Sequence, residues 1–139
     1  MERERAFAKE IASLENVFNF LDEFFRLETI DNRDSLAIQL VTEELFTNLV
    51  KYNTTSTNPV VVGLERDGKV VNLELVDRDV DRFDPAGLPE VDVDAPMSQR
   101  QPGGLGLHLV RAIVDKITFE YAERVMRIHV VKKLETNHA

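Results

Sequence analysis

Two polar side chains, Glu44 and Asn48, stand four residues apart in a stretch with helical periodicity. They project from the same side of the expected helix, at the border of its apolar face. A carboxylate beside a hydrophobic core costs free energy unless a partner compensates its charge. A divalent cation, or a water held for proton abstraction, would be such a partner. The alternative is a partly buried Glu44–Asn48 hydrogen bond with a structural role only.

A second carboxylate, Asp77, ends a valine-rich stretch with the character of a strand. It could accept a hydrogen bond from an exocyclic amine such as that of adenine, or it could be an acidic turn residue. Phe83 follows, just before Asp84 and Pro85. Its ring could cover a purine, although a ring in this position more often anchors the loop to the core.

Glycines occupy Gly103, Gly104 and Gly106, directly before an expected helix. Their backbone N–H groups can form a concavity at the positive end of the helix dipole, which suits phosphates. The string lacks the lysine of a P-loop, and Leu109 occupies the place of the third glycine in a dinucleotide-binding fingerprint. Neither of those folds is expected, and a plain loop-to-helix turn is the alternative.

Residues 86–102, upstream of these glycines, have no hydrophobic periodicity and contain three prolines and three acids. A structureless connection of this length inside a compact domain is usually functional or mobile. We therefore expect a lid. Arg100 within it either reaches a terminal phosphate or stays a solvated side chain.

Hydrophobic periodicity predicts the elements that position these groups. Apolar residues recurring at three and four predict helices at 14–27, with Ser13 as N-cap, at 35–52 and at 105–115. Valine-rich stretches on either side of Arg66, Asp67 and Gly68 predict a hairpin. The expected strands are 4–11, 59–64, 69–76, 116–121 and 125–132.

Length, charge and composition limit the class of protein. The chain has 139 residues, no cysteine and a formal net charge of −8. We expect one domain, 1–134, followed by a disordered tail, 135–139. The absence of cysteine and the spacing of the three histidines disfavour a zinc site. The negative charge disfavours direct nucleic-acid binding. No apolar stretch approaches the ~20 residues that cross a bilayer, so we expect a cytoplasmic protein.

Three polar segments follow one another along the chain, at 44–48, 77–85 and 103–107. In this order they resemble the N, G1 and G2 boxes of the GHKL ATPases, the superfamily of DNA gyrase, histidine kinases and MutL. More narrowly, the chain is similar to the small bacterial anti-sigma-factor serine kinases. That similarity rests on Glu-x-x-x-Asn at 44–48, on Phe-Asp-Pro at 83–85, and on the string Gly-Gly-Leu-Gly-Leu-His-Leu-Val that begins at Gly103. It spans nearly the whole chain.

This resemblance implies an α/β (α+β) two-layer sandwich, with helices on one face of a mixed β-sheet and ATP held between sheet, helices and lid. Glu44 would be the base that activates the attacking hydroxyl, Asn48 the Mg²⁺ ligand and Asp77 the adenine-reading acid. The other implied nucleotide contacts are Lys51, Phe83, Arg100, Gly103, Gly104, Leu105, Gly106 and Leu107.

The implied function is an ATP- and Mg²⁺-dependent protein serine kinase that is a homodimer. It would hold a sigma factor or another regulated target and phosphorylate a STAS-type anti-sigma antagonist. The alternative is a nucleotide-sensing module that sequesters a partner without phosphotransfer. Glu44 favours the kinase. The chain departs from the family pattern in two places: Asp79 stands where the G1 box has glycine, and residues 122–124 replace a late Gly-Thr. Both departures suggest weak or altered nucleotide binding, and the loss of the G1 glycine favours the binder.

Overall fold

The computed structural model describes residues 2–52, 57–80 and 104–135, with the backbone alone for 104–107. The expected lid, 86–102, and residues 136–139 of the expected tail lie outside this part. The elements follow the order β1 (Glu2–Phe7), the 3-10 helix η1 (Ile11–Ser13), α1 (Leu14–Leu27), α2 (Asn32–Tyr52), β2 (Val60–Asp67), β3 (Val70–Arg78), α3 (Gly104–Ile113), β4 (Lys116–Ala122) and β5 (Val125–Lys133).

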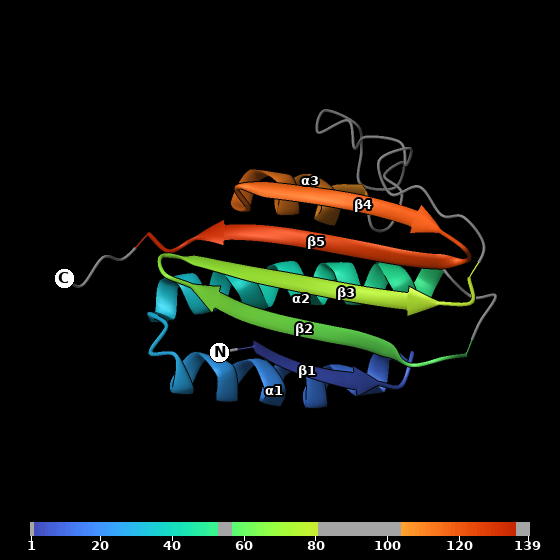
Figure 1. The fold of residues 1–139 in the computed structure, drawn as a ribbon, viewed down its shortest axis with the longest axis horizontal. Helices are drawn as coiled ribbons and strands as arrows, with labels where there is room; N and C mark the ends of the chain where they lie inside the picture. Colours follow the sequence, from blue (N-terminus) through green and yellow to red (C-terminus); the bar gives the residue numbers. More distant parts are fainter. Residues whose placement is uncertain (1, 53–56, 81–103, 136–139) are drawn as a thin grey trace.

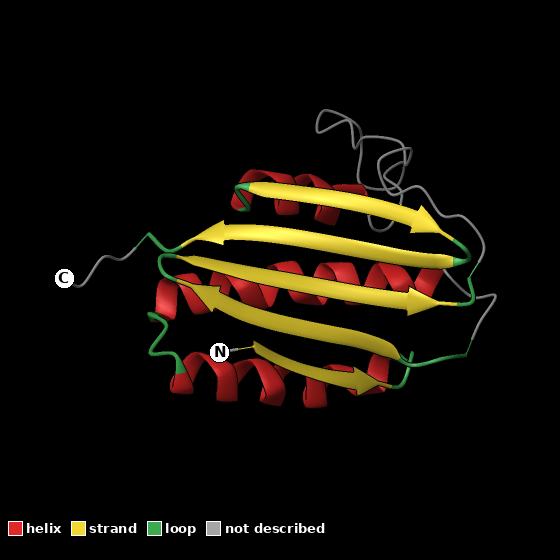
Figure 2. Cartoon of the chain, in the orientation of Figure 1, coloured by secondary structure: helices red, strands yellow, loops and turns green. Residues whose placement is uncertain are grey.

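The strands form one sheet in the order β1-β2-β3-β5-β4, and the helices cover one of its faces (Figures 1 and 2). The prediction of an α+β two-layer sandwich is confirmed. The expectation of a mixed sheet is wrong for the described strands, since every neighbouring pair is antiparallel. The reason is the crossover through α3: β3 and β4 run in the same direction, but β5 lies between them.

Helix ends differ from the predictions where local hydrogen bonds decide them. The helix predicted at 14–27 is confirmed, but Ser13 is itself helical and makes no side-chain cap bond, because η1 leads directly into α1. The helix α2 begins three residues before position 35. There Asp31 Oδ1 accepts a hydrogen bond from the Arg33 backbone N–H at 2.9 Å, as an N-cap does.

The predicted hairpin is confirmed, with longer strands and a tighter turn. Asp67 pairs with Val70, so Arg66 and Asp67 belong to β2, and the turn consists of Gly68 and Lys69. Gly68 has φ +61°, and a first turn residue in this region is typical of a type II′ hairpin. The first strand ends at Phe7, four residues before the predicted end, and this leaves residues 8–10 as a connecting segment.

The core lies between the sheet and the helices. Alternate β3 residues Val71, Leu73 and Leu75 are buried on the helix-covered face, while Asn72 and Glu74 lie on the opposite face. This alternation is the period-two pattern of a sheet covered on one side. Among the described helices, none is long and apolar enough to cross a membrane.

Candidate functional site

The helix α2 brings Glu44 and Asn48 into contact, as their spacing predicts. The Asn48 amide donates a hydrogen bond to the half-buried Glu44 carboxylate. Asn48 is only 5% exposed, and its Oδ1 is buried with no hydrogen-bond partner within the described residues. A buried acceptor left unsatisfied costs about 1–3 kcal/mol. This oxygen is therefore suited to be the single protein ligand of a Mg²⁺ ion. Mg²⁺ is a hard cation whose other ligands are commonly phosphate oxygens and waters.

Burial raises the pKa of Glu44 above its ordinary value of 4.5. The nearby Lys51 ammonium and the Asn48 hydrogen bond lower this pKa, while the Glu43 carboxylate raises it further. The net increase makes Glu44 a stronger base than a solvated glutamate. Lys51 itself is exposed on the last turn of α2, so its ammonium is accessible to a ligand.

Asp77 lies on the helix-covered face at the end of β3, opposite the buried Met126 of β5. Its side chain has no exposed surface, and the Lys9 Nζ lies 2.7 Å from its Oδ1. The two groups form an ion pair, although the ammonium does not meet Oδ1 with hydrogen-bond geometry. Lys9 has no role in the sequence-based prediction, which placed it inside a longer first strand.

Asp79, the residue in place of the G1 glycine, keeps a backbone conformation that favours glycine. Its φ is +58°, in the left-handed region that aspartate tolerates better than most residues. The backbone at Asp79 therefore adopts a conformation that glycine also adopts readily.

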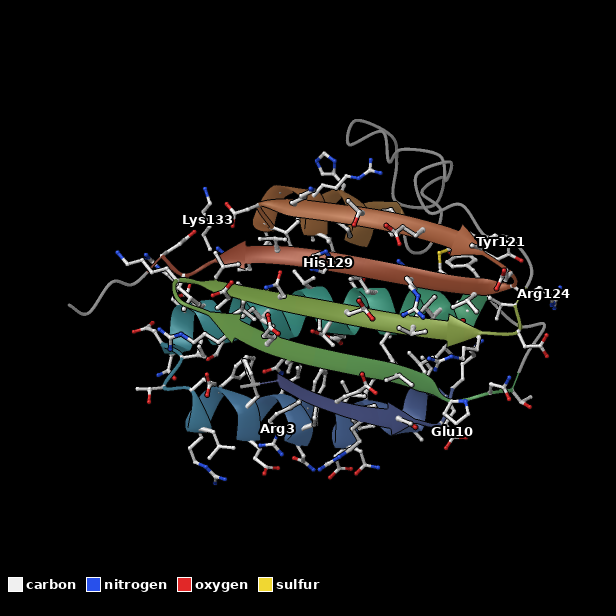
Figure 3. The ribbon with its side chains drawn as sticks, viewed as in Figure 1. Arg3, Glu10, Tyr121, Arg124, His129 and Lys133 are labelled. Atoms are coloured by element: carbon white, nitrogen blue, oxygen red, sulfur yellow. The ribbon has the colours of Figure 1, made fainter. Side chains whose placement is uncertain are left out.

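The two departures from the family pattern contact each other. The Arg124 guanidinium, from the β4–β5 turn, donates to Asp79 Oδ1 at 2.9 Å. The Val80 N–H donates to the Arg124 carbonyl at 3.0 Å, and the Tyr121 hydroxyl donates to the Val80 carbonyl at 2.7 Å. Figure 3 shows Tyr121 and Arg124 at the end of the sheet where these contacts form. These contacts hold Asp79 and Val80 against the last hairpin, β4–β5.

We expect Asp79→Gly to keep the free energy of unfolding and Asp79→Ala to lower it by about 1 kcal/mol. Alanine loses the Arg124 contact and is strained at positive φ, whereas glycine loses the contact but relieves the strain. The exposed ion pair contributes little by itself. Urea unfolding of both variants measures the difference. Equal losses for glycine and alanine would show that the left-handed backbone is not what position 79 requires.

The glycine-rich segment is described only from Gly104, where α3 begins. Phe83, Arg100 and Gly103 lie outside the described residues. For residues 104–107, which include Leu105, Gly106 and Leu107, the backbone forms the first turn of α3. This N-terminus lies toward the same end of the sheet as the end of β3 and the C-terminal half of α2 (Figure 1). The fold thus gathers the described parts of the three predicted boxes.

A groove between α2 and α3 opens beside Glu44 and was not predicted. Its cavity is about 210 Å³, and Leu40 and Leu109 on its rim are 47% and 53% exposed. Val110 and Ile113 line its floor. Large exposed apolar side chains next to one another are typical of a binding surface. Sequence periodicity could not separate these leucines from core leucines.

Comparison with known proteins identifies the family. The family model described as "Histidine kinase-like ATPase domain" matches residues 7–132. The chain belongs to this family. The resemblance to GHKL ATPases is therefore confirmed, and ATP binding is the property that the family implies. A comparison with curated protein sequences finds no match.

Two solved structures share the histidine kinase-like fold. The RsbU and RsbW domains of Rv1364c from Mycobacterium tuberculosis match with TM-score 0.71 and 15% identity over 96% of this chain and 32% of that chain. The histidine kinase AdeS from Acinetobacter baumannii matches with TM-score 0.53 and 14% identity over 96% of this chain and 68% of that one. This chain thus spans about a third of the Rv1364c structure. At these sequence identities, the two comparisons show a shared fold.

Proposed function

We propose that this chain is an ATP- and Mg²⁺-dependent protein serine kinase that phosphorylates a STAS-type anti-sigma antagonist. The observation that carries the proposal is the Glu44–Asn48 pair. A half-buried carboxylate with a raised pKa is held by an amide whose buried oxygen has no partner within the described residues. Such a pair supplies a base and a cation ligand on one helix face. The likeness to a structure containing an RsbW domain supports the same reading at the level of fold.

In this proposal, each residue has one role. When bound, ATP would supply the transferable phosphoryl group, and Mg²⁺ would neutralise charge on its phosphates. Asn48 Oδ1 would be the protein oxygen for the cation, and the Asn48 amide would orient the Glu44 carboxylate. Glu44 would take the proton of the serine hydroxyl as the serine oxygen bonds to the γ-phosphorus and the bond to the β-phosphate oxygen breaks, which would leave ADP. Lys51 and the backbone N–H groups at the start of α3 would attract the phosphates.

The groove between α2 and α3 is the docking surface that we propose for the protein substrate. It is continuous with Glu44, so a partner seated on Leu40 and Leu109 would bring its serine next to the base. We further propose that the chain is a cytoplasmic homodimer and that it also holds a sigma factor. The negative net charge gives no support to a nucleic-acid partner.

We expect Leu109→Glu to raise the KM for the protein substrate by about tenfold or more and to leave ATP affinity unchanged. A charge at position 109, on the apolar rim of the groove, would lose hydration when the partner covers it. The control is Leu27→Glu, because Leu27 is similarly exposed, at 49%, but lies at the end of α1. Steady-state transfer assays measure both variants. Equal KM values for the two variants would remove the groove from the docking surface.

The alternative function is a nucleotide-sensing module that sequesters its partner without phosphotransfer. The observation in its favour is the Lys9–Asp77 pair, which covers the proposed adenine acceptor. Incubation of the wild type with γ-labelled ATP, Mg²⁺ and purified STAS-domain proteins separates the two functions. The kinase predicts labelled phosphoserine on a STAS protein. A stable complex without any labelled serine would favour the sequestering module.

A further inference from the structure

The buried ion pair between Lys9 and Asp77 lies where the proposed function places the adenine acceptor. Strand register puts Phe7, the last residue of β1, opposite Val60, and puts Asp77 opposite Met126. These positions form one end of the sheet. Lys9, two residues after Phe7, follows β1 at this end, and Figure 3 shows the next residue, Glu10, there as well. The N-terminal segment thus reaches the base-recognition end of the site.

The geometry of the pair closes Asp77 to a ligand. The Asp77 side chain is 0% exposed and that of Lys9 is 3% exposed. The Lys9 ammonium occupies the position next to Oδ1, so an adenine amine that bonds to this oxygen must displace it. The ammonium and the amine are also the same kind of partner, since each offers N–H donors to a carboxylate. Lys9 and adenine therefore compete for one acceptor.

The pair is built so that it can open. Burying two charges costs free energy that their attraction repays only in part, so a ligand that offers N–H donors to the same oxygen can compete with the ammonium. Lys9 lies in the connecting segment 8–10, between β1 and η1, and its neighbours Ala8 and Glu10 are exposed. The lysine side chain is a flexible four-carbon stem, which gives its ammonium other positions to adopt.

We propose that Lys9 sets the nucleotide affinity of this domain by competing with the adenine amine for the Asp77 carboxylate. This proposal rests on the role of Asp77 as adenine acceptor in the proposed function. The apparent affinity of a ligand falls by the fraction of molecules in which its binding state is populated. ATP must therefore break the Lys9–Asp77 pair when it binds. The measured affinity for ATP is lower than its intrinsic affinity by the free energy that breaking this pair costs.

The principal test is the ATP affinity of Lys9→Met, measured by calorimetry with Mg²⁺. Methionine keeps much of the side-chain volume but has no charge, so ATP should bind about tenfold tighter than in the wild type. The matched control is Lys132→Met. Lys132 is also buried, but it lies toward the other end of the sheet, where it pairs with Glu135. Unchanged or weaker ATP binding by Lys9→Met would overturn the proposal.

Two further variants keep the test decisive if Lys9→Met folds poorly. Lys9→Arg keeps the charge pair and adds a bidentate donor, so it should fold and bind ATP more weakly than the wild type. Wild-type affinity in Lys9→Arg would contradict the competition. In the double variant Lys9→Met with Asp77→Asn, the gain in affinity should disappear. A gain that persists would show that Lys9 acts through another group.

These binding measurements are independent of phosphotransfer. Tighter ATP binding by Lys9→Met without phosphoserine on any partner would reject the kinase and keep the role of Lys9. Transfer by the wild type, with no change of affinity in either Lys9 variant, would reject the role of Lys9 and keep the kinase.

Discussion

Glu44→Gln should lower phosphoryl transfer to the protein substrate by about 10²-fold or more, while ATP affinity stays close to that of the wild type. The amide keeps the shape of the carboxylate but cannot accept the serine proton. Single-turnover transfer from labelled ATP measures the chemical step, and calorimetry measures ATP binding. The control is Glu65→Gln, which removes another half-buried carboxylate, on the uncovered face of the sheet. A Glu44→Gln enzyme with wild-type transfer would exclude Glu44 as the base.

The raised pKa of Glu44 gives this prediction a pH signature. The carboxylate must be ionised to accept a proton, so the wild-type rate of phosphoryl transfer should fall as pH decreases through a value above 4.5.

The raised pKa of Glu44 affects the free energy of unfolding in the opposite direction, since low pH favours the fold. The stability that this carboxyl contributes is fully present below its unfolded pKa and is lost as pH rises through the raised folded pKa. Glu44→Gln removes this loss, so thermal unfolding at pH 7 should occur at a temperature no lower than in the wild type.

Asn48→Ala should weaken ATP binding about tenfold or more in the presence of Mg²⁺ and change it little without Mg²⁺. The reason is that Asn48 Oδ1, buried and without a partner among the described residues, is the oxygen that the cation would use. The affinity gain on adding Mg²⁺ is therefore the quantity to compare between the two proteins.

A suitable control is Asn72→Ala, since Asn72 lies on the uncovered face and bonds to His129. It should keep the full Mg²⁺ dependence. An Asn48→Ala protein whose ATP affinity still increases normally with Mg²⁺ would show that the cation takes its protein ligand elsewhere.

Sequence periodicity determined most of the fold. The stripe at 14–27 and the alternation on both sides of Gly68 predict α1 and the β2–β3 hairpin, because apolar residues must face one core whatever their neighbours are. The Glu44–Asn48 contact was predictable for the same reason, since residues four apart share a helix face. The antiparallel arrangement of the whole sheet was not predictable, because it depends on where the α3 crossover places β4.

Only the tertiary structure decided which distant side chains complete the site. Lys9 reaches Asp77 because β1 ends beside the start of β2, and Arg124 reaches Asp79 because the β4–β5 turn lies beside the end of β3. No local pattern encodes either contact, since each partner is an ordinary charged residue in its own segment. The burial that raises the pKa of Glu44 is likewise a property of packed layers. The residue types and their spacing are local, whereas the electrostatics of the site arise from the long-range packing of the sheet and its helices.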